Sequence, residues 1–169
     1  KGTSIKWNPA IKTENDRKAL FDGLLKNKID VVDTDHAPHT IEEKNQSYFK
    51  APSGGPLVQH SLVAMLEFYH QGKTRLETIV KKMCHAPADL FRIKGRGYIR
   101  EGFKADLVLV DLNSPWIVDK TNILYKCNWS PFEGTRFKSK VKYTIVNGKI
   151  VFDDGKLNDN IGERLEFEY

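Results

Sequence analysis

The sequence has few cysteines and no long apolar run, and each shortage argues against a class of protein. Only Cys84 and Cys127 are present among the 169 residues, far apart and in no CxxC or other paired spacing. This pattern argues against a disulfide framework and a cysteine zinc site, and favours a reducing, cytoplasmic setting. Charged residues make up 29% of the chain and interrupt every apolar run, so we expect no membrane-spanning segment.

The chain also lacks a strong or clustered excess of charge. Lysine and arginine outnumber the acids 27 to 22 and are spread along the sequence, so nucleic-acid binding gets little support. Hydrophobic residues make up 40% and aromatic residues 11%. This composition is too apolar for a disordered chain and is sufficient for one sizeable core.

Residues 1–95 have the pattern of helices around one buried strand. Helices are expected at residues 14–26, 57–70, 74–83 and 86–91, from helical spacing of apolar residues and from capping residues or prolines at their starts. Residues 29–34 are short, β-branched and nearly all apolar, as in a strand buried on both faces of a parallel sheet. One such strand cannot form a sheet alone. The chain begins at Lys1 without a signal-peptide pattern, so we expect it to start partway through a larger protein.

From residue 96 onward the pattern is that of strands. Residues 105–111 predict one strand, and residues 141–152 predict a hairpin with its turn at Asn147-Gly148. We therefore expect two domains, an α/β domain over residues 1–95 and a β-rich unit over residues 96–169.

The stretch Asp-Thr-Asp-His-Ala-Pro-His at residues 33–39 directly follows the expected buried strand. Active sites of α/β folds gather at the C-terminal ends of strands. A carboxylate there, Asp35, could coordinate a metal ion and accept a proton from bound water. His39, held by the intervening Pro38, could donate a hydrogen bond to a substrate oxygen. The alternative is that these side chains only cap a helix or satisfy turn amides.

Other polar residues have weaker claims to a role in a site. Asp33 is expected to support Asp35 or form an ion pair, and His36 is expected to be structural. Asn8, before Pro9, could present its amide to a ligand or belong to an Asn-Pro turn. Three histidines, His60, His70 and His85, lack the i, i+4 partner of a helical metal pair. Residues 40–55 are expected to form a loop over the strand end, where loops often carry function.

Taken together, these residues resemble the C-terminal part of the dihydroorotases of the amidohydrolase superfamily. The resemblance rests on Lys6-x-Asn8-Pro9-Ala10-Ile11-Lys12, Asp16-Arg17, Ile29-Asp30, Thr34-Asp35-His36-Ala37-Pro38-His39, Glu43-Lys44 and Ala51-Pro52-x-Gly54. The stretch from Gly97 to Asp111 resembles the segment that returns the superfamily's chain to its small β domain.

The resemblance implies the C-terminal part of a (β/α)8 TIM barrel together with part of a small β-sandwich domain. It implies a zinc-dependent hydrolase, with a binuclear centre in the full-length enzyme, that interconverts N-carbamoyl-L-aspartate and L-dihydroorotate. By this analogy Asp35 is both a zinc ligand and the general base. Asn8 and His39 would bind the small-molecule substrate, with backbone groups of Ala51, Gly54 and Gly55 at the pyrimidine edge. A homodimer is also implied.

The sequence departs from the family pattern, and two other functions stay open. Ala10-Ile11-Lys12 replaces a Pro-Leu-Arg, and Ser53-Gly54-Gly55-Pro56 replaces a more apolar loop. The family's His-x-His, its carbamylated lysine and its two further metal histidines have no match, so we expect these residues alone to be inactive. An allantoinase or dihydropyrimidinase is one alternative, suggested by Trp129-Ser-Pro-Phe-Glu-Gly and opposed by His39. A non-catalytic scaffold is the other.

Overall fold

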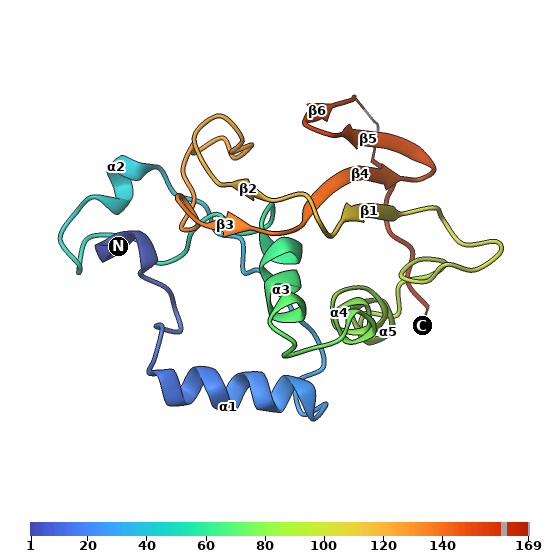
Figure 1. Cartoon of the computed structure of the whole chain (residues 1–169), viewed down its shortest axis with the longest axis horizontal. Coiled ribbons are helices and arrows are strands. Elements are labelled where there is room, and N and C mark those ends of the chain that lie inside the picture. Colours follow the sequence, from blue (N-terminus) through green and yellow to red (C-terminus); the bar gives the residue numbers. More distant parts are fainter. Residues whose placement is uncertain (160–161, 169) are drawn as a thin grey trace.

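The computed structural model describes residues 1–159 and 162–168, and its helices precede its strands along the chain (Figure 1). The helical elements are η1 (Gly2–Ile5), α1 (Glu14–Leu25), α2 (Ile41–Lys44), α3 (Ser61–His70), α4 (Leu76–Val80), the π-helical turn η2 (Lys81–His85) and α5 (Ala86–Leu90). The strands are β1 (Leu107–Asp111), β2 (Trp116–Ile117), β3 (Arg136–Phe137), β4 (Lys140–Val146), β5 (Lys149–Asp153) and β6 (Lys156–Leu157).

Two helices begin at capping boxes, in which a threonine and an acid satisfy each other's free amides. At α1 the Thr13 hydroxyl accepts from the Asp16 amide at 3.4 Å, and Asp16 accepts from the Thr13 amide at 3.0 Å. This confirms the helix predicted at residues 14–26. At α2 the pair is Thr40 and Glu43, inside a stretch for which only a loop was expected.

The helix predicted at residues 57–70 begins four residues later than expected, at Ser61. The amides that would form its first turn are held by tertiary partners instead. Leu57 and Val58 donate to Nδ1 of His36, and Gln59 donates to the hydroxyl of Tyr125. Hydrogen bonds to distant residues therefore delay the start of the helix.

The two helices predicted at residues 74–83 and 86–91 form one continuous helical run, in which η2 joins α4 to α5. The sequence Thr74-Arg-Leu-Glu predicts that Thr74 caps the first of these helices, and this prediction is wrong. The N-cap of α4 is Arg75, with no side-chain hydrogen bond to the helix, and Glu77 pairs with the Arg75 guanidinium at 3.2 Å.

The strand predicted at residues 29–34 is not formed in the described part of the chain. The Val32 amide of this segment donates to the Lys82 carbonyl at 3.0 Å. Val31 and Val32 instead line an open apolar hollow of about 590 Å³ beside α1, together with Phe21, Leu24 and Phe68. A strand needs at least one hydrogen-bonded neighbour, and the described residues supply none for residues 29–34.

The β-rich part contains two antiparallel sheets, one in the order β1-β4-β5-β6 and the other formed by β2 and β3. The predicted hairpin is confirmed as β4 and β5. Its turn residues Asn147 and Gly148 have φ of 52° and 79°, which the two-residue turn of a tight hairpin requires. The strand predicted at residues 105–111 is confirmed as β1.

The main hydrophobic core lies between α3 and the smaller sheet. Val63 of α3 packs with Val118, Ile123 and Phe137. In Figure 1, α3 lies directly under β3, with the larger sheet to one side. The core therefore joins residues on both sides of residue 95, and the expected division into two domains at that point stays a prediction.

The C-terminal tail returns to the junction between the helical and β-rich parts. The Lys94 amide donates to the Glu166 carbonyl at 2.8 Å, and the Glu168 amide donates to the Arg92 carbonyl at 2.9 Å. The tail was expected to complete the β-rich unit, and residue 169 lies outside the described residues. Among the helices that the structure describes, none has the length and apolarity needed to cross a membrane.

Candidate functional site

The carboxylate of Asp35 lies open at the end of the 29–34 segment. Asp35 is exposed and has a φ of 43°, a left-handed conformation that is uncommon outside glycine. No hydrogen bond or ion pair joins its carboxylate to another described residue. Asp33 accepts a 2.6 Å hydrogen bond from the amide of the next residue, Thr34. Asp33 therefore stabilises the turn and forms no ion pair with another described residue, so the ion pair expected as one of its two roles is not seen there. The Asp35 carboxylate is free for a ligand.

The contacts of His36 are of the structural kind predicted for it. Its Nδ1 accepts from the amides of Leu57 at 3.0 Å and Val58 at 3.3 Å, which places the proton of the neutral ring on Nε2. The ring packs against that of Tyr125, with centroids 5.4 Å apart. Next to it, the Ala37 amide donates to the Gly55 carbonyl at 3.3 Å. These hydrogen bonds hold the 33–39 segment against residues 55–58.

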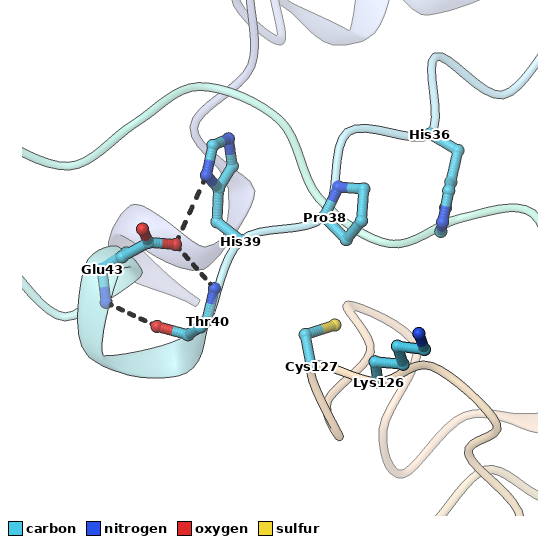
Figure 2. A pocket seen from close by; sticks show the side chains of 7 residues that line it. All are labelled: His36, Pro38, His39, Thr40, Glu43, Lys126 and Cys127. Carbon is cyan, nitrogen blue, oxygen red and sulfur yellow. Dashed lines mark hydrogen bonds and ion pairs between the residues drawn. The ribbon is translucent and has the colours of Figure 1, made fainter.

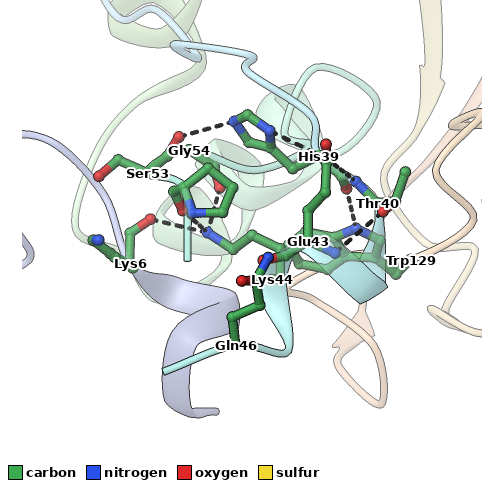
Figure 3. A network of polar contacts seen from close by, with 10 residues as sticks. Lys6, His39, Thr40, Glu43, Lys44, Gln46, Ser53, Gly54 and Trp129 are labelled. Atoms are coloured by element: carbon green, nitrogen blue, oxygen red, sulfur yellow. Dashed lines mark hydrogen bonds and ion pairs between the residues drawn. The ribbon is translucent and has the colours of Figure 1, made fainter. Parts of the chain in front are cut away.

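His39 lies between α2 and the loop of residues 51–55, here called the 51–55 loop (Figure 3). Its Nε2 is 3.1 Å from the Ser53 carbonyl oxygen, and its Nδ1 is 3.5 Å from the Glu43 carboxylate. Its own carbonyl accepts a 2.7 Å hydrogen bond from the indole of Trp129. About a third of the side chain is exposed, so the ring is oriented by the protein and still reachable by a ligand.

A cavity of about 390 Å³ opens beside His39 (Figure 2). One wall is formed by residues of the 36–43 segment, and the other by Lys126 and Cys127, which approach from the β-rich part. Sequence reasoning did not identify these two residues. The only signal was their closeness to the Trp129-Ser-Pro-Phe-Glu-Gly stretch, which had been noted for its resemblance to other families.

The 51–55 loop is closely packed, with Ala51, Gly54 and Gly55 buried and the two residues between them half-buried. Gly54 has a φ of 107°, and an added Cβ would lie 2.7 Å from that of Ala37. At Gly55 an added Cβ would lie 2.7 Å from Trp7 and 3.3 Å from Trp129. Both positions therefore require glycine. Gly54 and Ala51 also use their amides internally, donating to the carbonyls of Lys6 and Ser47, both at 2.9 Å.

Asn8 is exposed at the end of the segment that follows η1. Its side chain forms no hydrogen bond with another described residue, although its neighbour Trp7 packs against the 51–55 loop. The structure thus brings His39, the loop and the Asn8 segment into one neighbourhood, with Asp35 four residues before His39. The substrate-binding roles of Asn8, His39, Ala51, Gly54 and Gly55 stay predictions, as does the catalytic role of Asp35.

The described residues supply too few ligands for a metal ion. Among residues 1–159 and 162–168, no group of three or more His, Cys, Asp or Glu side chains is arranged to hold one. A catalytic zinc ion takes three protein ligands and a water. Asp35 offers one free carboxylate of a suitable kind, so it fits a zinc centre only as one ligand among several.

His60 lies in the core and not in the site. It has no exposed surface, and its ring stacks against Trp116 and Phe137. Its Nδ1 is 3.1 Å from the Tyr125 hydroxyl and 3.3 Å from Ser130 Oγ. Burial lowers the pKa of His60 to about 4, so the ring is neutral at physiological pH.

Residues 10–151 match the amidohydrolase family. The chain belongs to this family. It is 38% identical over 151 residues to a dihydroorotase of Ehrlichia canis, covering 89% of this chain and 34% of that protein. A dihydroorotase of Pyrococcus horikoshii is 35% identical over 162 residues, covering 95% and 37%. The chain thus spans about a third of the length of these amidohydrolases, in their C-terminal portion.

Solved structures of amidohydrolases have the same fold. The L-hydantoinase (dihydropyrimidinase) of Arthrobacter aurescens superposes with a TM-score of 0.86 at 30% identity, covering 94% of this chain and 36% of that one. A D-hydantoinase gives a TM-score of 0.85 at 22% identity, covering 92% and 35%, which supports the fold alone. The predicted fold class, the C-terminal part of a TIM barrel with part of a small β domain, is confirmed.

Proposed function

We propose that this chain is the C-terminal part of a zinc-dependent cyclic-amide hydrolase that interconverts N-carbamoyl-L-aspartate and L-dihydroorotate in pyrimidine biosynthesis. One observation carries the proposal. The free Asp35 carboxylate comes four residues before His39, whose ring is oriented beside a cavity and held by the 51–55 loop. Identities of 35–39% to curated dihydroorotases support the choice of substrate.

Asp35 is the proposed proton carrier. Its carboxylate would accept a proton from the attacking water and return it to the ring nitrogen as the amide bond breaks. When bound, zinc would polarise the amide carbonyl and make the water more acidic. Because Asp35 forms no hydrogen bond with another described residue, both of its oxygens remain available for these tasks.

His39 and Asn8 are the proposed anchors of the substrate. Dihydroorotate and carbamoyl aspartate both carry a carboxylate that a histidine N–H or an asparagine amide can bind. In this structure the His39 N–H faces the Ser53 carbonyl, which a substrate carboxylate would replace with a stronger, charge-assisted partner. Fixing the ring in this way lowers the barrier by several kcal/mol, on the order expected for positioning.

A hydantoinase or dihydropyrimidinase is the second candidate, favoured by the structural likeness to the Arthrobacter aurescens enzyme at 30% identity. The ring substrates of such enzymes lack the dihydroorotate carboxylate, so His39 would have no comparable partner.

A non-catalytic scaffold is the third candidate. The homodimer and the cytoplasmic setting remain proposals from the family.

The test is the hydrolysis of dihydroorotate, hydantoin, dihydrouracil and allantoin by the full-length protein that contains this chain. We expect dihydroorotate to be the preferred substrate. Asp35→Asn should lower kcat by about 10²- to 10⁴-fold, the usual contribution of a general base. Asp33→Asn is the matched control, since an asparagine can still accept from the Thr34 amide, and it should leave kcat nearly unchanged.

Two results would contradict this proposal. Preferred hydrolysis of hydantoin or dihydrouracil would favour the second candidate. Absence of hydrolysis with all four substrates, by a protein with its zinc bound, would favour the scaffold.

A further inference from the structure

Lys44, the last residue of α2, is a lysine with no exposed surface. Its ammonium group donates to three main-chain carbonyls, those of Gly54 at 2.8 Å, Pro52 at 2.9 Å and Lys6 at 3.2 Å. An ammonium group has three N–H donors. The three carbonyls therefore satisfy the charged form of Lys44 completely (Figure 3).

No carboxylate pairs with this buried charge among the residues that the structure describes. Glu43, its neighbour in sequence, faces His39 instead. The ring of Trp7 is 5.6 Å from the Lys44 nitrogen, close enough for a cation–π attraction. Burial and the nearby Lys6 ammonium lower the pKa of Lys44. A buried lysine without a counter-ion is costly, which suggests that the position serves more than stability.

The three carbonyls belong to two segments that are distant in sequence. Pro52 and Gly54 lie in the 51–55 loop, next to the Ser53 carbonyl that faces His39. Lys6 lies two residues before Asn8, and its carbonyl also accepts from the Gly54 amide at 2.9 Å. The Lys44 ammonium therefore binds both segments at once. They are also joined directly, by the Gly54 amide and by the Lys6 ammonium, which donates to the Ala51 carbonyl at 2.6 Å.

We propose that Lys44 is a positioning residue, whose ammonium group holds the 51–55 loop and the Lys6–Asn8 segment in the arrangement that binds substrate. The inference rests on the proposed function, because that function assigns these two segments to substrate binding. Lys44 itself is too buried to touch substrate. It acts through the carbonyls that it fixes.

Removal of the ammonium would have a specific consequence. Three carbonyls would lose a charged donor. That of Lys6 would keep the Gly54 amide, whereas those of Pro52 and Gly54 have no other donor among the described residues, and leaving them without a partner is strongly unfavourable. The carbonyls would turn toward water, and the loop would move with them. The groups proposed to bind the substrate ring would then be displaced. Asp35 would keep its position, because it lies outside this network.

The test compares Lys44→Met with Lys82→Met in the full-length protein. Lys82 is the matched control, because it is also buried, at 2% exposure, and donates to a main-chain carbonyl, that of Ile29, outside the network. We expect Lys44→Met to raise the KM for dihydroorotate about tenfold or more with kcat within about threefold, the pattern of lost uniform binding. Lys82→Met should leave KM within about twofold.

Hydrogen exchange provides a second measurement that does not depend on turnover. In Lys44→Met the Gly54 amide should exchange about tenfold faster, because its segment opens more often, whereas Lys82→Met should leave it unchanged. If Lys44→Met does not fold, Lys44→Gln retains two amide donors and should give an intermediate KM and exchange rate.

The outcomes separate this inference from the proposed function. Faster exchange at Gly54 in a Lys44→Met protein that hydrolyses none of the four substrates would support the role of Lys44 in holding the 51–55 loop. It would overturn the proposed function. An unchanged KM in an active Lys44→Met protein, or equal effects of Lys44→Met and Lys82→Met, would overturn the positioning role.

Discussion

The imidazole of His60 is enclosed by Trp116, Phe132 and Phe137 and has no exposed surface. Burial lowers its pKa from 6.5 to about 4. Between these pH values the unfolded chain binds a proton at this residue and the folded chain does not. The free energy of unfolding therefore falls as the pH decreases from about 6.5 to about 4, by up to about 3 kcal/mol.

This pH dependence is tested by urea unfolding of the full-length protein at pH 7 and pH 4.5. His60→Gln keeps a hydrogen-bonding side chain beside Tyr125 without a titrating ring. We expect the wild type to lose about 2 to 3 kcal/mol more than His60→Gln on acidification. Equal losses in the two proteins would show that His60 is not the group that titrates.

At the scale of residues, candidate site residues could be chosen from the sequence, whereas the buried contacts that hold their segments could not. Asp35 and His39 could be selected because of their residue types and their place after a predicted strand, and their roles stay predictions. The burial of Lys44 could not be predicted, since lysines are almost never fully buried. Its three acceptors are main-chain carbonyls, which no residue pattern reveals.

Among the elements, α2 is a short helix whose N-terminal cap should affect both stability and the proposed substrate binding. Thr40→Ala removes the hydroxyl that accepts from the Glu43 amide at 3.2 Å, and we expect a stability loss of about 1 kcal/mol. Because α2 carries Glu43 and Lys44, the KM for dihydroorotate should also rise. Thr13→Ala removes the equivalent cap of α1 and should cost similar stability without changing KM. The measurements are thermal unfolding and steady-state kinetics, and equal KM values in the two variants would contradict the link.

Two elements with local causes were predicted well, although the equally local capping box of α2 was missed, and elements that depend on distant partners were predicted poorly. The Thr13 capping box and the Asn147-Gly148 turn are complete within a few residues, so α1 and the β4-β5 hairpin lie where expected. The start of α3 is delayed by His36 and Tyr125, which are distant in sequence. The 29–34 strand fails to form for the same kind of reason, because its pairing partners are not among the described residues.

In the molecule as a whole, the open hollow beside α1 and the lack of a three-ligand metal cluster among the described residues fit a chain that spans about a third of the length of its relatives. Apolar side chains of α1 and of residues 29–32 surround this hollow of about 590 Å³. We expect calorimetric titration of the isolated 169-residue chain with zinc to reveal no tight, stoichiometric binding, because one carboxylate cannot replace three ligands. The full-length protein is the positive control. Tight binding by the isolated chain would contradict this prediction.

The hydrogen bond from Trp129 to the His39 carbonyl has a consequence for recombination between relatives. A chimera that takes its β-rich part from another amidohydrolase would retain Asp35 and His39 and still alter the support of His39, unless an indole donor is transferred with it. The exchangeable unit in this part of the protein is therefore larger than Asp35 and His39 alone.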